Sequence, residues 1–239
     1  MNEGTLLKVS AIDVFYRSFQ ALREVSLEVH SGEKVALVGA NGAGKSTLLN
    51  TISGLIQPAR GRIEFEGQSI AATDPSQIVA LGVSQVPQGR RVFPDLSVLD
   101  NLILGSYNRN ARSKKEQNFE MVYDLFPLLK ERRKQLAKTL SGGEQQMLAL
   151  GRGLMSSPKL MLLDEMSLGL APVVIGKVYR ALREIRKRGI TILFIEQSVR
   201  RSLVEADRAY IIEAGRVVLG GKAADLMEES EIKKAYFGL

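Results

Sequence analysis

The chain has 239 residues, no cysteine and a single histidine, and it carries a formal net charge of +7. The absence of cysteine excludes a disulfide framework and a thiolate metal site, and a lone histidine argues against structural zinc. Hydrophobic residues make up 45% and charged residues 25% of the chain, which is typical of a globular protein long enough to bury a sizeable core.

The excess positive charge leaves three interpretations open. Basic runs at 130–134 and 183–189 fall in segments with helical periodicity, where lysine and arginine usually cover a solvated face. A basic face can also meet an anionic membrane surface or a nucleic acid. No apolar run reaches the roughly 18 residues that a membrane-spanning helix needs. The N-terminal residues lack a basic segment followed by an apolar one, so we expect no signal peptide.

Strand and helix patterns alternate along the chain. Period-two alternation predicts half-buried strands at 6–16 and 23–30, and short apolar runs predict buried strands. The remaining predicted strands are 34–39, 61–67, 83–87, 159–165, 190–196 and a hairpin at 208–221 that turns at Ala214-Gly215. The predicted helices are 45–53, 97–105 with Ser97 as its cap, 114–126, 143–157, 172–189 and a short helix after 196. This alternation favours a mainly parallel sheet covered on both faces.

Polar residues gather where the predicted parallel strands end. Gln88, Asp164 with Glu165, and Glu196 with Gln197 each follow a buried strand. Since parallel sheets bind ligands beyond the carboxyl ends of their strands, we expect these residues to belong to a site. The lone histidine, His30, is expected to be a surface residue at a strand end.

The stretch GANGAGKST at 39–47 follows a predicted strand and opens a helix. It matches the phosphate-loop pattern, in which glycines let successive backbone N–H groups surround phosphate oxygens at a helix N-terminus. In that pattern Lys45 reaches the β- and γ-phosphates and the Ser46 hydroxyl binds Mg²⁺. The candidate nucleotide-binding residues are Gly39, Asn41, Gly42, Ala43, Gly44, Lys45, Ser46 and Thr47.

Two further motifs complete the candidate site. Asp164 ends a buried strand and can hold the Mg²⁺ shell, whereas Glu165 can orient and deprotonate an attacking water. The string LSGGEQQ at 140–146 places Ser141, Gly142 and Gly143 before a long helix. We interpret these three residues as a second phosphate-binding surface, a nest at a helix N-terminus without a preceding strand. A plain serine cap with two turn glycines is the alternative.

GANGAGKST, VPQ, LSGGEQQ and LMLLDE, in this order and spacing, resemble the ATP-binding subunits of ABC transporters over essentially the entire chain. The resemblance implies an α/β P-loop NTPase with a mainly parallel core sheet, an N-terminal antiparallel β lobe and an inserted helical subdomain. It implies a single domain over 1–239, with its core at 1–88 and 157–239 and the helical subdomain at 89–156.

The resemblance also implies roles for individual residues. ATP would lie between two cassettes packed head to tail, with Ser141, Gly142 and Gly143 acting on the partner's nucleotide. Tyr16 falls where the family stacks an aromatic ring on adenine, although a core aromatic is an alternative. Gln88 matches the glutamine that contacts Mg²⁺ and the attacking water. The following segment, 89–102, would face the permease, with Arg90, Arg91 and Phe93 as candidate contacts or as parts of a solvated loop.

Three positions depart from the general family pattern. Met166 stands where proline is usual, Ala171 where an aspartate is usual, and Gln197 where a histidine senses the γ-phosphate. Gln197 can still donate an amide hydrogen bond, and Glu165 stays the candidate base. The strings PQGRRVFP, SLGLAP and IEQS resemble the shorter ATPase subunit of branched-chain amino acid importers, from which Met166 alone departs.

This resemblance implies an ATPase that energises import of branched-chain amino acids or related amides from the cytoplasmic face of the membrane. Its partners would be permease subunits, a second ATPase subunit or a second copy, and, indirectly, an external substrate-binding protein. The alternative is a soluble ABC-type ATPase acting on nucleic acid or ribosomes. The absence of cysteine, of a heptad run and of a second cassette argues against it, and we expect no nucleic acid partner. A kinase or GTPase is a third reading, but no guanine-reading string is present.

Overall fold

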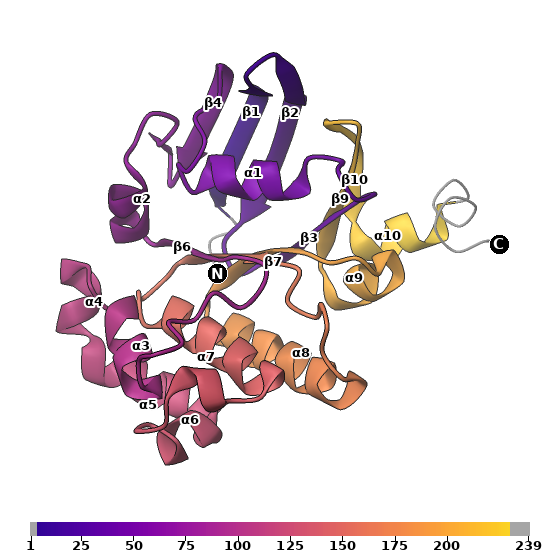
Figure 1. Ribbon diagram of the computed structural model, residues 1–239. Helices are drawn as coiled ribbons and strands as arrows, with labels where there is room; N and C mark the ends of the chain where they lie inside the picture. Colours follow the sequence, from indigo (N-terminus) through magenta and orange to yellow (C-terminus); the bar gives the residue numbers. More distant parts are fainter. Residues whose placement is uncertain (1–3, 230–239) are drawn as a thin grey trace. The chain divides into compact units, whose positions relative to one another are not determined.

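The computed structural model describes residues 4–229. The chain divides into two compact units, of which one comprises Met1–Pro75 and Thr191–Leu239 and the other Ser76–Ile190. The second unit is therefore inserted in the sequence of the first. Figure 1 shows the strands and helices of both units, most of them with the labels used below.

The first unit contains an antiparallel sheet in the order β2-β1-β4-β5. Its strands are β1 (Thr5–Tyr16), β2 (Phe19–His30), β4 (Arg60–Phe65) and β5 (Gln68–Ser69). Along β1 and β2 buried residues alternate with exposed ones, because one face of the sheet packs on the core and the other meets solvent. Lys8 lies opposite Glu28 in the register and forms an ion pair with it on the exposed face, 2.9 Å apart.

The first unit also contains the parallel strands. β3 (Lys34–Val38) pairs in parallel with both β8 (Thr191–Ile195) and β9 (Arg208–Glu213), and β9 forms an antiparallel hairpin with β10 (Arg216–Lys222). Every residue of β3 and β8 is buried, which explains why both read as unbroken apolar runs. Among its described residues, this unit has the helices α1 (Lys45–Ile52), α9 (Val199–Glu205) and α10 (Ala223–Glu228).

The second unit pairs β6 (Val83–Val86) in parallel with β7 (Leu160–Asp164), and its other regular elements are helices. The long helices are α7 (Gly142–Leu154), which begins within the LSGG string, and α8 (Pro172–Lys187). The shorter ones are α2 (Pro75–Leu81), α3 (Val98–Gly105), α4 (Arg109–Ser113), α5 (Lys115–Leu125), α6 (Pro127–Glu131) and the 3₁₀ turn Ala137–Thr139. As predicted, the Ser97 side chain caps α3 by accepting a hydrogen bond from the Asp100 N–H.

The predicted fold class is confirmed: parallel pairs form the core strands, the N-terminal strands are antiparallel, and helices dominate the middle of the chain. Several short elements were not predicted, namely β5, α2, α4, α6, α10 and the 3₁₀ turn. Each has at most seven residues, too few to display a helical or alternating period.

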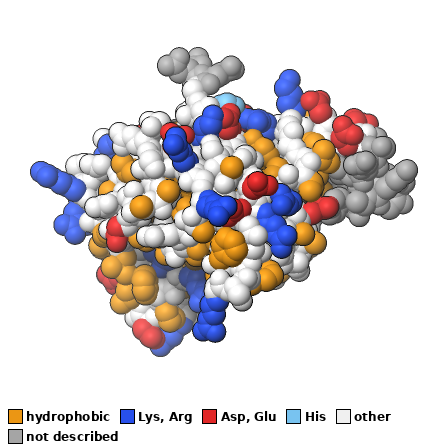
Figure 2. All heavy atoms as spheres, turned by 90° about the horizontal axis from the view of Figure 1, so that it is seen from above, with side chains coloured by type: hydrophobic (Ala, Val, Ile, Leu, Met, Phe, Trp, Pro, Cys, Tyr) orange, Lys and Arg blue, Asp and Glu red, His pale blue; other side chains and the backbone are white. Residues whose placement is uncertain are grey.

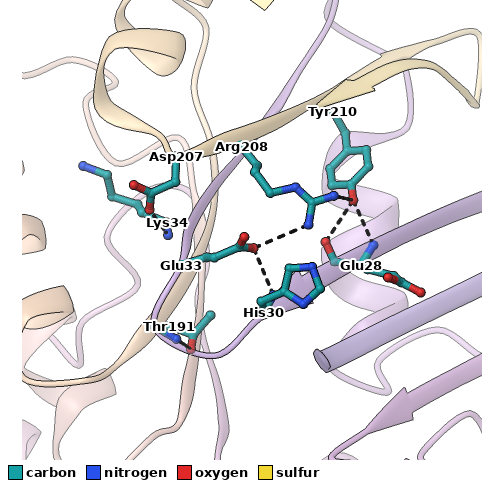
Figure 3. A network of polar contacts seen from close by, with 9 residues as sticks. Glu28, His30, Glu33, Lys34, Thr191, Asp207, Arg208 and Tyr210 are labelled. Carbon is teal, nitrogen blue, oxygen red and sulfur yellow. Dashed lines mark hydrogen bonds and ion pairs between the residues drawn. The ribbon is translucent and has the colours of Figure 1, made fainter. Parts of the chain in front are cut away.

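A polar network ties the end of β2 to β9 (Figure 3). The Tyr210 hydroxyl donates to the Glu28 carbonyl at 2.9 Å and accepts from the Glu28 N–H and from Arg208, each at 3.0 Å. The Glu33 carboxylate accepts from the His30 N–H at 2.9 Å and lies 3.8 Å from Arg208. His30 is half-buried, with its Nδ1 atom buried, so the expected surface histidine is instead packed against this network.

Charge is well mixed on the face drawn in Figure 2. Basic and acidic side chains are interspersed there, with apolar side chains between them. On this face the basic side chains therefore do not form one patch, although the chain as a whole has a net charge of +7. Within residues 4–229, none of the helices combines the length and the apolar character needed to cross a bilayer.

Candidate functional site

The phosphate loop occupies the turn between β3 and α1 in the first unit, and two of its glycines are required by geometry. Gly39 has a φ of 152°, and a Cβ at this position would lie 2.1 Å from the Ile212 carbonyl oxygen. Gly44 precedes α1 with a left-handed φ of 105°, which residues with a Cβ rarely adopt. Any larger residue at Gly39 would push the loop off β9.

Lys45 points back into the curl of the loop. Its ammonium donates to the carbonyl oxygens of Gly39, at 2.7 Å, and Ala40, at 2.8 Å, and the residue is only 6% exposed. The loop therefore holds a buried positive charge among its own backbone groups, at the N-terminus of α1. Both features favour bound phosphate.

The other predicted loop residues divide by exposure. Asn41, Gly42 and Ser46 are exposed, whereas Ala43 is buried. The Ala43 carbonyl accepts a hydrogen bond from the Gly215 N–H at 3.0 Å, so the β9–β10 hairpin supports the loop from behind. The exposed Ser46 side chain in the first turn of α1 is accessible to a ligand.

Tyr16 lies next to the loop helix. Its hydroxyl is 3.4 Å from the Thr47 hydroxyl, and the residue is 47% exposed at the end of β1. The alternative of a core aromatic is therefore wrong, because nearly half of the ring residue faces solvent. An exposed aromatic ring beside a phosphate loop is suitably placed for stacking on a base.

Gln197 shares the edge of the first unit at which the loop begins. Leu37 of β3 pairs with Ile195 of β8, so Gly39 and Gln197 each follow a paired position by two residues. Gln197 is exposed, whereas its neighbour Glu196 is only 3% exposed. Of the two polar residues after β8, the glutamine is thus the one that can reach a ligand.

In the second unit, Gln88 and Glu165 form a hydrogen-bonded pair. The Gln88 side-chain amide donates to Glu165 Oε2 at 2.8 Å. Val86 of β6 pairs with Leu163 of β7. Gln88 and Glu165 each follow one of these paired residues by two positions, so the strand pairing brings them together. Asp164, the last residue of β7, is 5% exposed. Glu165 has a φ of 46°, a conformation that costs a non-glycine residue about 1–3 kcal/mol and is common at functional sites.

The signature string LSGGEQQ begins helix α7. Ser141 is the exposed N-cap residue, and its N–H donates to the Glu144 carboxylate at 2.8 Å. Gly142 and Gly143 lie in the first helical turn, so the helix begins one residue before its predicted start at 143. A Cβ on Gly142 would lie 2.7 Å from Arg90 Nη1, and one on Gly143 would lie 2.5 Å from Val174. Both glycines thus permit close packing at the exposed helix N-terminus.

The structure places two of the departures from the family pattern, and Met166 has a clear packing partner. Met166, where proline is usual, is 2% exposed, and its sulfur accepts a hydrogen bond from the Gln146 amide at 3.3 Å. This contact joins the turn after β7 to the signature helix. Ala171, where aspartate is usual, occupies the N-cap of α8 without a side-chain hydrogen bond, and Pro172 begins the helix.

Sequence reasoning missed Arg152, which lies near the C-terminal end of α7. Its guanidinium donates to the Arg91 carbonyl and lies 5.0 Å from the centroid of the Phe93 ring. Arg152 is about 60 residues from Arg91 and Phe93 in sequence, and no local pattern connects them. An arginine in an otherwise apolar helical stretch was the only available signal.

Comparison with known proteins agrees with these motifs. The family described as "ABC transporter" matches residues 22–167. The high-affinity branched-chain amino acid transport ATP-binding protein BraG of Pseudomonas aeruginosa is 46% identical over 233 residues, covering 98% of this chain and 100% of that protein. The lipopolysaccharide export system ATP-binding protein LptB of Acidithiobacillus ferridurans is 32% identical, covering 98% of this chain and 97% of that protein.

Solved structures give the same result for the fold. A nucleotide-free ATP-binding cassette from an ABC transporter superposes with a TM-score of 0.85 at 27% identity, covering 98% of this chain and 99% of that one. The phosphate loop, the Gln88–Glu165 pair and the signature helix thus occur in a chain whose full length matches such cassettes. The chain belongs to the ABC transporter family, as one of its ATP-hydrolysing cassettes.

Proposed function

We propose that this cassette hydrolyses ATP to energise the import of branched-chain amino acids or related amides through a membrane permease. The observation that carries the substrate class is the 46% identity to BraG over 98% of this chain and 100% of that protein. The 32% identity to the exporter subunit LptB is appreciably lower, which favours import over export. PQGRRVFP, SLGLAP and IEQS are the strings that resemble the importer branch.

In the proposed mechanism the phosphate loop binds the nucleotide and the second unit supplies the base. Backbone N–H groups of 39–44 and the Lys45 ammonium neutralise the β- and γ-phosphates. Glu165 accepts the proton of the attacking water, and Gln88 holds the carboxylate in place through the 2.8 Å hydrogen bond. The exposed Gln197 amide donates to the γ-phosphate. An amide carries no charge, so it stabilises the developing negative charge less than a protonated imidazole does.

The proposed metal is Mg²⁺, with Ser46, Gln88 and Asp164 as its protein ligands. A hydroxyl, an amide oxygen and one carboxylate are hard oxygen donors, and Mg²⁺ is usually held by one or two carboxylates together with phosphates and waters. The donor set therefore fits the ion. Bound Mg²⁺ would neutralise charge on the β- and γ-phosphates.

We further propose that the cassette pairs head to tail with a second ATPase subunit. Ser141 is exposed at the N-terminus of α7, where the helix dipole and the close-packed Gly142 and Gly143 favour an approaching phosphate. These residues would contact the nucleotide that the partner's phosphate loop holds. Tyr16 would stack on the adenine of the nucleotide bound to its own loop.

The proposed permease contact is a surface of the second unit that we call the docking face. It consists of exposed apolar residues in and around α3, namely Phe93, Leu96, Ile103, Leu104, Tyr107 and Leu136. Leu96 and Leu136 are held side by side, because the Ala137 N–H donates to the Leu96 carbonyl at 3.0 Å. Exposed large apolar residues at several positions of one region favour a protein-binding role for that region. Such docking would place the cassette on the cytoplasmic face of the membrane, with the substrate-binding protein reached only through the permease.

The proposal is tested by recovering the affinity-tagged full-length chain from detergent-solubilised membranes and reconstituting what co-purifies into vesicles. We expect a multi-spanning permease and a second ATPase, and ATP-dependent uptake of labelled leucine, isoleucine or valine once the substrate-binding protein is added. The matched control is the same complex with Lys45→Ala. Recovery with nucleic acid that stimulates ATP hydrolysis would instead favour the soluble alternative, and ATP-dependent extrusion of lipid would favour export.

A further inference from the structure

Arg152 is a partly buried cation that lies outside the phosphate loop and the signature string. One guanidinium nitrogen donates to the Arg91 carbonyl, and the group lies 5.0 Å from the Phe93 ring centroid, within cation–π range. Its Nη1 atom is buried without a hydrogen-bond partner among the residues that the structure describes. Burial also lowers the pKa of this guanidinium. Burying a charged group costs free energy unless the group is paired and hydrogen-bonded, so the contacts that Arg152 does make are important for keeping it in place.

The loop that Arg152 contacts is conformationally demanding. Gly89, Arg90 and Arg91 have φ values of 82°, 69° and 42°, so three consecutive residues lie in the left-handed region. Non-glycine residues hold this conformation only where the surroundings impose it. The hydrogen bond from Arg152 falls on the carbonyl of the last residue in this run, Arg91.

This loop, residues 88–93, connects separate parts of the candidate site within the second unit. Gln88 at its start holds the Glu165 carboxylate. Arg90 lies over Gly142 at the N-terminus of the signature helix and is 3.5 Å from the Gly169 carbonyl. A change in the loop backbone would therefore move the side chains that face both the base and the signature.

The far end of the loop is fixed separately. The Phe93 N–H donates to the fully buried Asn101 side chain at 2.8 Å, and the Asn101 amide donates back to the Phe93 carbonyl at 3.0 Å. Asn101 thus fixes the Phe93 backbone, whereas Arg152 contacts the Phe93 ring and the Arg91 carbonyl. Arg152, from the signature helix, holds the end of the left-handed segment 89–91 through its hydrogen bond to the Arg91 carbonyl.

We propose that Arg152 is a positioning residue, which holds the Arg91 carbonyl and the Phe93 ring and thereby keeps Gln88 on Glu165. This inference rests on the proposed function, since it assigns Arg152 to the same hydrolytic site. Phe93 is 49% exposed and belongs to the docking face. Arg152 consequently links the docking face to the base and to the signature helix. A permease that contacts the Phe93 ring would change the contact between this ring and Arg152.

The first test measures steady-state ATP hydrolysis by the full-length chain in the membrane complex recovered with it. Arg152→Gln is expected to lower kcat by about tenfold to a hundredfold, the usual result of misplacing a catalytic group. The KM for ATP should change much less than kcat, because the substitution leaves the phosphate loop and Lys45 unchanged. Arg152→Lys should recover part of kcat, since lysine keeps the cation over the ring but lacks the planar fork. Arg112→Gln, an exposed arginine on α4, is the matched control.

The second test is spectroscopic. The chain has no tryptophan, so Phe93→Trp creates a single reporter in the purified full-length chain, and a tryptophan ring favours cation–π contact. Adding Arg152→Gln to this background should shift the emission maximum, whereas adding Arg112→Gln should leave it unchanged. Thermal melts identify any variant that fails to fold. If Arg152→Gln does not fold, Phe93→Leu replaces it as the test variant. This substitution removes a half-exposed ring, and we expect it to lower kcat without changing KM.

The outcomes separate the two proposals. If the wild-type complex does not hydrolyse ATP, the proposed function fails. If it does hydrolyse ATP and a folded Arg152→Gln variant keeps the wild-type kcat, the assignment of Arg152 is overturned. A parallel loss of kcat and ATP affinity, or an unchanged tryptophan emission, would equally contradict a positioning role.

Discussion

Replacing Glu165 with glutamine tests the assignment of the base. The substitution keeps the shape of the side chain, and its amide oxygen can still accept the 2.8 Å hydrogen bond from Gln88. The variant should therefore fold and bind ATP normally, since Lys45 and the phosphate loop are unchanged. It lacks a proton acceptor for the attacking water. General-base catalysis contributes about 10²–10⁴ in rate, so we expect kcat to fall by that factor, equivalent to about 3–5 kcal/mol of transition-state stabilisation.

The assay compares kcat with the affinity for ATP in the wild-type complex, the Glu165→Gln variant and a Glu120→Gln control. Glu120 is an exposed glutamate on α5, so its loss should change neither quantity. Slow hydrolysis should also trap a nucleotide-bridged dimer, visible by size-exclusion chromatography with ATP. Wild-type turnover in Glu165→Gln would refute the assignment of the base, and an equal loss of ATP affinity would refute the separation of binding from chemistry.

Three further predictions address binding and stability. Lys45→Ala should weaken ATP binding by about tenfold or more, since it removes a charge-assisted contact to phosphate; nucleotide titration measures this, and unchanged affinity contradicts the phosphate-loop assignment. Met166→Ala should lower the free energy of unfolding by about 2–5 kcal/mol, because it leaves a cavity and removes the acceptor of Gln146. In urea unfolding, Met166→Leu should cost less, since it keeps the volume. Tyr210→Phe should cost about 1–3 kcal/mol by leaving buried polar groups unpaired, whereas Tyr107→Phe at an exposed position should cost almost nothing.

The elements that were predictable from the sequence are those with a local signature. β3, β7 and β8 are short apolar runs whose residues are all buried, and α8 is long enough to display a full helical period. The phosphate loop is recognisable because its glycines are dictated by its own backbone, as the φ of Gly44 shows. The order of the motifs then identifies the family of the chain without any knowledge of its contacts.

The contacts that organise the site could not be predicted in this way. Gln88 and Glu165 are 77 positions apart, and Arg152 and Arg91 are 61 apart. Which side chains meet across such distances depends on strand register and on the path of a loop with left-handed residues. Met166 read only as a departure from the family pattern, because its partner Gln146 becomes visible only when the turn after β7 packs against α7.

The interrupted order of the first unit has a consequence for biosynthesis. Glu28 and Tyr210, which share a hydrogen-bonded network, are 182 positions apart, and the whole second unit is translated between them. At about 5–20 residues per second, a ribosome needs about 10–35 s to add the missing strands. During that interval β3 and the nascent phosphate loop lack β8, β9 and the Gly215 turn. The inserted unit can complete its own core first, so nascent chains should gain protease resistance in 76–190 before they acquire the capacity to bind ATP.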